Sequence, residues 1–383
     1  MDVLERRGFG FVIGTLSERN SARRKCQEAG TKSQTTMATR RQVVLAVLGA
    51  VGFFLLVQLG TIALLEPFQQ AGYQAVENPQ DPTNTVFYIG ILLAATAVML
   101  LLFRFSRTGL LRAFLVLTSG LISAYVFSVL LPPDILGISL PVHGGALLGA
   151  IVVMAGLTLY PEWWVIDASA AVMGMGAAAL FGISFDLLPA LLLLLALAIY
   201  DAISVYGTEH MLTLASGVME LRVPVVVVIP TSLSYSFIEM AEDMAADVDG
   251  SERDEKGKGD GATEKPRPTE EETAVEAEST DESEPLERDA FFIGLGDAVI
   301  PTILVATATV FLDTPAILGI EAAALGALIG TLLGLLVLLW MVMKGRAHAG
   351  LPLLNGGAIV GYLLAALASG VSLVEALGVA GYF

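Results

Sequence analysis

The sequence predicts an all-α polytopic membrane protein with nine transmembrane helices. Hydrophobic residues make up 55% of the 383 residues and charged residues only 15%, and the mean hydropathy is +0.72. This composition is far more apolar than that of a soluble domain. Runs of about twenty apolar residues, the length that crosses a hydrocarbon core of ~30 Å, recur along the chain. In a bilayer such runs form helices, because a helix satisfies its own backbone polar groups.

The nine predicted spans are separated by turns that contain proline, glycine and charged residues, such as EPFQQ, PPD, YPEWW and LDTP. These residue types are expected where a chain returns to water. The spans cover residues 42–65, 85–103, 110–131, 140–160, 163–183, 187–205, 290–312, 321–343 and 351–370.

The basic residues predict the orientation of the spans. If nine spans alternate in direction, all 21 Lys and Arg fall on one side of the membrane. Nine of them precede the first span, and seven lie between the sixth and the seventh. Because basic loops stay on the cytoplasmic side, the N-terminus is predicted inside and the C-terminus outside. The location that follows is the cell membrane, as a multi-pass protein.

The remaining segments divide the chain. Residues 1–36 are polar and basic, and we expect either a disordered tail or a mis-called start upstream of Met37. Residues 37–207 carry spans one to six, and residues 290–383 carry spans seven to nine. Residues 239–289 contain twenty Asp and Glu against six Lys and Arg, which predicts a disordered acidic cytoplasmic loop. Such a loop could bind a basic partner or serve as a solvated linker.

Residues 208–238 are predicted to form an amphipathic interfacial helix followed by a short extended segment. Apolar residues recur at helical spacing from Met211 to Leu221, as in helices that lie in the membrane surface. The following residues 223–229 are β-branched, lie between prolines and are too short to span a bilayer.

Two carboxylates lie inside predicted spans. Asp201 is near the cytoplasmic end of span six, and Asp297 is near the cytoplasmic end of span seven, which runs the opposite way. At ~1.5 Å per helical residue both lie ~8–12 Å from the cytoplasmic face, so the two side chains can meet. Asp167, a few residues into span five, is expected near the interface. An ionisable group within a span is costly and marks a functional site by default.

A pair of carboxylates at one depth has a specific chemistry. Two close carboxylates in a low dielectric cannot both ionise, so they share a proton. The ionised partner can take a proton from water while the protonated partner polarises a peptide carbonyl. Gly294 and Gly296, just before Asp297, remove side chains where another backbone would approach. The alternative for the glycines is the small-residue packing that is common between membrane helices.

No other chemistry is evident in the sequence. The single cysteine, Cys26, cannot form an intramolecular disulfide, and His143, His210 and His348 have no metal-ligand spacing. We therefore expect no metal and no cofactor, and no nucleic-acid partner. The oligomeric state is not specified by the sequence.

The motifs resemble the presenilin and signal-peptide-peptidase family of GxGD intramembrane aspartyl proteases. The similarity lies in YD at Tyr200-Asp201, GLGD at 294–297 and LPLLN at 351–355, and is greatest with archaeal presenilin homologues. It extends over about residues 186–372, and nine spans with a cytoplasmic N-terminus match the presenilin orientation. The resemblance implies a protease that cleaves transmembrane protein substrates within the lipid bilayer, with Asp201 and Asp297 as catalytic residues.

The resemblance also implies which residues contact the substrate. The family's third motif is Pro-Ala-Leu, whereas Leu353 stands here in place of the alanine and adds bulk beside the substrate path. We expect Pro352 to break the start of span nine and to shape the wall of the site. The implied substrate-binding residues are Tyr200, Ile293, Gly294, Leu295, Gly296, Pro352, Leu353 and Leu354.

An unwound substrate needs new partners for its backbone, because unpaired backbone groups in lipid cost several kcal/mol. Residues 225–229 and 290–293 are candidate extended segments beside the site. We expect them to flank an unwound substrate strand by β-augmentation.

Other functions compete with this prediction. A proton-coupled transporter could use the paired carboxylates, but it predicts inverted repeats and polar residues along several spans, and neither is found. A prepilin or preflagellin peptidase shares only the GxGD motif and usually has fewer spans. A non-catalytic chaperone of the same fold would not need both aspartates.

Overall fold

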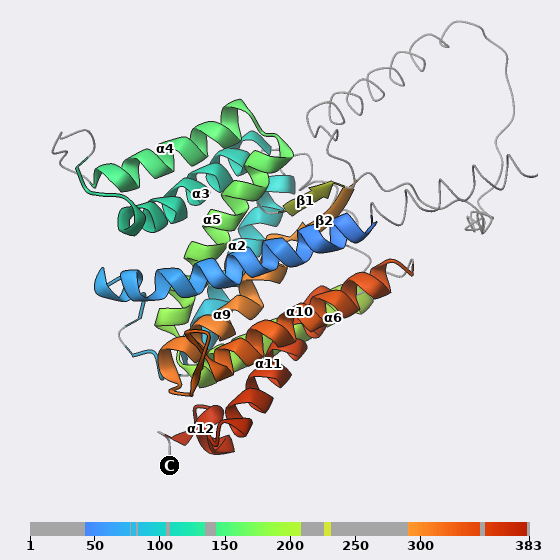
Figure 1. The fold of residues 1–383 in the computed structure, drawn as a ribbon. Coiled ribbons are helices and arrows are strands. Elements are labelled where there is room, and N and C mark those ends of the chain that lie inside the picture. Colours follow the sequence, from blue (N-terminus) through green and yellow to red (C-terminus); the bar gives the residue numbers. More distant parts are fainter. Residues whose placement is uncertain are drawn as a thin grey trace, which may run out of the picture.

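The computed structural model describes residues 43–76, 78–81, 83–104, 108–134, 143–207, 226–230, 290–344 and 349–380. Within them the chain forms nine long apolar helices, two pairs of short strands and a short C-terminal helix (Figure 1). The long helices are Val43–Gln70, α2 (Thr83–Arg104), α3 (Thr108–Leu130), α4 (Gly144–Leu159), α5 (Trp163–Ser184), α6 (Leu187–Gly207), α9 (Leu295–Phe311), α10 (Ala322–Val342) and α11 (Gly350–Ala368). The short C-terminal helix is α12 (Leu373–Ala376).

Six of these helices are long and apolar enough to cross a membrane. The other three apolar stretches are shorter: Thr83–Val98, Gly144–Leu159 and Leu295–Phe311. Each of the nine helices coincides with one predicted apolar run. The chain is therefore a mostly helical, multi-pass membrane protein, as the composition predicts. The sequence-based predictions for residues 1–36, 208–225 and 231–289 lie outside the described residues.

The prediction for the seventh span is wrong at its N-terminal end. The predicted helix of residues 290–312 begins only at Leu295, because Ala290–Gly294 forms strand β2. Strand β2 pairs antiparallel with β1 (Val226–Pro230), with Val228 opposite Phe292. Four of the five residues of β1 are valine or isoleucine, which favour extended backbone.

A second strand pair joins α9 to α10. Strands β3 (Ala316–Ile317) and β4 (Ile320–Glu321) form a hairpin whose turn has positive φ at Leu318 and Gly319. Two consecutive residues with positive φ are typical of tight hairpin turns. This hairpin was not predicted from the sequence.

Helices α10 and α11 are in direct backbone contact along a glycine seam. An added Cβ at Gly330 would collide with the backbone carbonyl of Gly357, and one at Gly361 would collide with that of Gly326. A side chain at Gly334 would likewise meet the carbonyl of Leu353. Small residues at four-residue spacing let membrane helices approach in this way. The seam therefore fixes where the first turn of α11 lies.

Contacts of α11 with α6 and of α9 with α5 hold the remaining helices in place. Helix α11 is tied to α6 by a buried hydrogen bond from Asn355 Nδ2 to Leu194 O, 2.9 Å long. Helix α9 packs closely on α5, where Gly182 lies against the side chain of Ala306. Helix α11 packs against both α10 and α6, and β1, paired with β2, packs against α5 (Figure 1). These contacts position the ends of α6, α9 and α11 relative to one another.

Candidate active site

The structure brings Asp201 of α6 and Asp297 of α9 close enough for their charges to interact. Asp297 is the third residue of α9 and lies in its first turn, whereas Asp201 lies six residues before the end of α6. Both side chains are partly buried. This proximity is what the prediction of a carboxylate pair requires, and the common depth of the two residues in a bilayer stays a prediction.

The N-terminus of α11 provides hydrogen-bond donors to this pair. The backbone N–H of Leu351 donates to Asp201 Oδ2 at 3.0 Å, and the backbone of Gly350 also hydrogen-bonds to Asp201. The first N–H groups of a helix have no partner within the helix, and the helix dipole makes this end positive. The first turn of α11 therefore stabilises negative charge on Asp201.

Gly350 also lies directly against the second aspartate. A Cβ atom built on Gly350 would be 3.2 Å from Asp297 Oδ2 and 3.5 Å from its Oδ1. The 3.2 Å separation is tighter than an ordinary van der Waals contact, so a side chain at this position would require the carboxylate to shift by a few tenths of an ångström. The backbone of Gly350 is therefore adjacent to both aspartates.

The expected effect of Pro352 on the helix start is not observed. Helix α11 begins at Gly350, two residues before the proline, and Leu351 is helical rather than extended. Proline is tolerated here because the N–H groups of the first helical turn have no intrahelical partners. The start of α11 is thus not set by Pro352, and the site uses the N–H groups of the two residues before it.

The residues implied as substrate contacts fall into two groups. Tyr200 is half-exposed, and Gly294 and Gly296 are exposed, with no atom closer than 3.6 Å to an added Cβ. By contrast, Leu295 and Leu354 are 6% and 0% exposed and pack in the hydrophobic core. Ile293, Pro352 and Leu353 are partly buried. Gly294 and Gly296 therefore leave space for another backbone next to Asp297.

The two extended segments lie beside the site but pair with each other. Val227 is opposite Ile293, and Val226 is opposite Gly294, so no strand can insert between β1 and β2. The structure bears out the extended backbone of both segments, and the expectation that they flank a substrate strand stays a prediction. The pairing satisfies the backbone groups that each strand would otherwise leave unpaired in an apolar environment. A further strand can join only at an outer edge of this sheet.

The sequence did not indicate the contacts that three residues make near the site. Gly350 and Leu351 act through backbone atoms, which side-chain patterns do not reveal. Asp167 of α5 accepts a hydrogen bond from Val228 N at 2.8 Å and so contacts β1. The sequence signals for these residues were weak: Gly350 precedes LPLL, and Asp167 is a carboxylate inside an apolar run.

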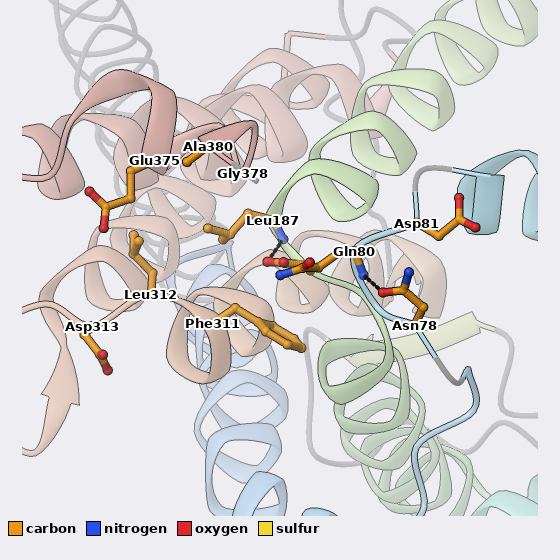
Figure 2. Close-up of a pocket in the computed structure, with 11 residues that line it drawn as sticks. Asn78, Gln80, Asp81, Leu187, Phe311, Leu312, Asp313, Glu375, Gly378 and Ala380 are labelled. Carbon is orange, nitrogen blue, oxygen red and sulfur yellow. Dashed lines mark hydrogen bonds between the residues drawn. The ribbon is translucent and has the colours of Figure 1, made fainter. Parts of the chain in front are cut away.

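A polar pocket of about 410 Å³ lies at the other end of the helices (Figure 2). It is lined by the first residue of α6, Leu187, which lies ~20 Å along the helix from Asp201. Its carboxylates are Asp81, Asp186, Asp313 and Glu375. Among the described residues, no group of three His, Cys, Asp or Glu side chains is placed to hold a metal ion. The pocket is separate from the paired aspartates.

The comparisons with known proteins agree with this geometry. Residues 51–371 match the family model described as signal-peptide peptidase, presenilin aspartyl protease. One solved structure, described as a presenilin family intramembrane aspartate protease in a C222 space group, is 32% identical. It aligns over 85% of this chain and 100% of its own, with a TM-score of 0.56. A second, described as a presenilin family intramembrane aspartate protease in a P2 space group, is 35% identical. It aligns over 84% of this chain and 97% of its own, with a TM-score of 0.54.

No curated protein sequence gives a significant match to the chain. The family model nevertheless covers well over half of the residues, including α6, α9 and α11. The chain therefore belongs to the signal-peptide peptidase and presenilin aspartyl protease family and is an intramembrane aspartic endopeptidase.

Proposed function

We propose that Asp201 and Asp297 form the catalytic dyad that hydrolyses peptide bonds of transmembrane substrate helices. The observation that carries the proposal is that α6, α9 and the N-terminus of α11 converge on these two carboxylates. Two carboxylates that share one proton supply a general base and a general acid at the same bond.

The two aspartates take different roles in the proposed reaction. Because the N–H groups of Gly350 and Leu351 stabilise negative charge on Asp201, we assign the ionised role to Asp201. Asp201 takes a proton from water as the water oxygen bonds to the peptide carbonyl carbon, and Asp297 gives its proton to the carbonyl oxygen. The tetrahedral gem-diol intermediate then collapses: the C–N bond breaks, the leaving nitrogen takes up the proton from Asp201, and one hydroxyl of the intermediate returns its proton to Asp297 as the carbonyl group of the new carboxylic acid forms.

The substrate strand is proposed to add to the outer edge of β2. Strand β2 leads directly into α9, and Gly294 at its end lies beside Asp297. Backbone pairing at this edge would replace the hydrogen bonds that a helix loses when it unwinds in lipid. The exposed Gly294 and Gly296 leave room for the substrate backbone, and Tyr200, Ile293, Pro352 and Leu353 lie around it.

The proposed topology is nine membrane spans in the cell membrane, with the N-terminus in the cytoplasm and the C-terminus outside. The nine apolar helices of the described residues and the distribution of Lys and Arg support it. Transmembrane proteins that reach the site from the bilayer are the substrates.

The test is the loss of cleavage in Asp201→Asn and Asp297→Asn, assayed with purified protein and a generic single-span substrate in detergent. Each variant should show no detectable cleavage and an unchanged elution and melting profile, because the mechanism needs one ionised and one protonated carboxyl group. Cleavage near the wild-type rate by either variant would refute the dyad.

A further inference from the structure

A carboxylate in α5 is bonded to the backbone of β1. Asp167 is the fifth residue of the apolar helix α5, and its Oδ1 accepts a 2.8 Å hydrogen bond from the N–H of Val228. The side chain of Val228 is 2% exposed, so this bond lies in the protein interior. An ionisable side chain in a membrane helix costs free energy of insertion, so by default it has a functional or structural role.

Stabilisation of the α5 dipole does not account for Asp167. That helix has its own acidic N-cap, because Glu162 Oε2 accepts a 3.4 Å hydrogen bond from Trp163 N. Asp167 lies beyond the first turn, where the effect of the helix dipole falls off. The hydrogen bond between Asp167 and β1 is therefore the interaction that explains the position of this carboxylate.

The hydrogen bond from Val228 defines which way the strands face. In an antiparallel pair, the N–H and C=O of one residue point to the same side, and successive residues alternate. Since the N–H of Val228 points to Asp167, its partner Phe292 has its N–H and C=O on the outer side of β2. Asp167 therefore occupies the outer edge of β1, and the outer edge of β2 carries backbone groups that face away from β1.

We infer that Asp167 is a positioning residue that closes the β1 edge and anchors the β1–β2 pair to α5, so that a substrate strand adds only to β2. This inference rests on the proposed function and specifies how its substrate is aligned. Because the sheet is anchored to α5, β2 is held at a fixed position relative to Asp297. Asp297 lies three residues after the end of β2. The peptide bond that reaches the aspartates is then set by the pairing register.

The test compares Asp167→Leu, which removes the acceptor at similar size, with Asp167→Asn, which keeps a carbonyl oxygen in its place. Cleavage rates and the exact masses of the products are measured on one single-span substrate. We expect Asp167→Leu to lower kcat/KM by about tenfold or more and to yield products with shifted termini. Asp167→Asn should restore the wild-type termini and remain within about threefold of the wild-type rate.

The reciprocal change is Val228→Pro, which removes the donor N–H without removing a β1–β2 hydrogen bond. Proline is compatible with an outward-facing position on an edge strand. The matched control is Val226→Pro, because the N–H of Val226 also points outward but makes no hydrogen bond with Asp167. Val228→Pro should shift the product termini and Val226→Pro should not. Adding Asp167→Leu to Val228→Pro should cause little further loss, because the two changes remove the same bond.

Unchanged product termini in both Asp167→Leu and Val228→Pro would overturn the inference and leave only a structural role for Asp167. Equal defects in Asp167→Asn and Asp167→Leu would also overturn it, because the acceptor oxygen would then not be the determinant. Failure of the dyad is seen separately, as cleavage retained by Asp201→Asn. If Asp167→Leu does not fold, the product masses from folded Val228→Pro still show whether the hydrogen bond between Val228 and Asp167 sets the cleavage position.

Discussion

The α-carbon of Gly350 lies so close to Asp297 that an added Cβ would be 3.2 Å from Oδ2 of the carboxylate. We therefore expect Gly350→Ala to shift the Asp297 carboxylate by a few tenths of an ångström relative to Asp201. Because the backbone of Gly350 also bonds to Asp201, the change affects both carboxylates. Cleavage should fall by about tenfold or more, which corresponds to ~1.4 kcal/mol in the barrier. The measurement is kcat/KM for a single-span substrate in detergent.

The matched control for this variant is Gly356→Ala on the same helix. An added Cβ at Gly356 meets no atom within 4 Å, so alanine is accommodated there. Activity should remain at the wild-type level, and α11 gains slightly from the better helix propensity of alanine. Equal activity of the two variants would show that the contact between Gly350 and Asp297 has no role in catalysis.

Replacement of Phe292 by proline tests the outer edge of β2. The N–H of Phe292 faces away from β1, so its removal leaves the β1–β2 pairing intact but takes one donor from a substrate strand. We expect kcat/KM to fall by about tenfold with little change in melting temperature. Phe292→Ala keeps the N–H and serves as the control for the loss of the side chain. If Phe292→Pro cleaves no more slowly than Phe292→Ala, the substrate does not pair at this position.

The glycine seam predicts a large effect on stability. Gly330→Ala places a Cβ against the backbone carbonyl of Gly357, and a backbone contact cannot relax as a flexible side chain can. We expect a destabilisation of ~1–3 kcal/mol, typical of overpacking, together with reduced cleavage. Thermal unfolding in detergent measures the first effect. Gly52→Ala, whose Cβ has no neighbour within 4 Å, should melt like the wild type.

Deletion of residues 245–283 should preserve cleavage. Pro230 and Ala290 are opposite each other in the β1–β2 pair, so the intervening segment leaves and re-enters the described structure at one place. A much shorter connection can therefore join the two strands. The acidic composition of the deleted residues supplies no apolar surface for packing. A folded deletion variant without activity would contradict the prediction of a linker.

The helical part of the fold could be predicted because long apolar runs leave few alternatives in a bilayer. All nine runs contain a helix in the described residues, yet their ends were less predictable. Residues 290–294 are as apolar as the helix that follows them, so hydropathy placed them in the span, whereas the separate expectation of an extended segment at 290–293 is confirmed by β2. The hairpin around Leu318 and Gly319 depends on positive φ values that the sequence LDTPAILGIE did not indicate to us.

Candidate site residues could be chosen from the sequence where a side chain carries the signal, and their catalytic role stays a prediction. Asp201 and Asp297 stand out because carboxylates are rare within spans, and their equal depth follows from counting residues along two helices. The donors from Gly350 and Leu351 are backbone groups, so only the three-dimensional position of α11 reveals them. Asp167 was visible as an acid, but its partner is a backbone N–H 61 residues further along the chain. The sequence around Asp167 and the sequence around Val228 contain no signal that these two residues are hydrogen-bonded.

Because the backbones of α10 and α11 touch at Gly330 and Gly357, these two helices form a single mechanical unit. Their relative sliding would drive side chains or carbonyl groups into one another, which is not possible without separating the pair. Any rearrangement that withdraws Leu351 from Asp201 must therefore carry α10 along with α11. Because the β3–β4 hairpin leads directly into α10, we expect a displacement of the hairpin to move both helices and so to change the hydrogen bond at Asp201.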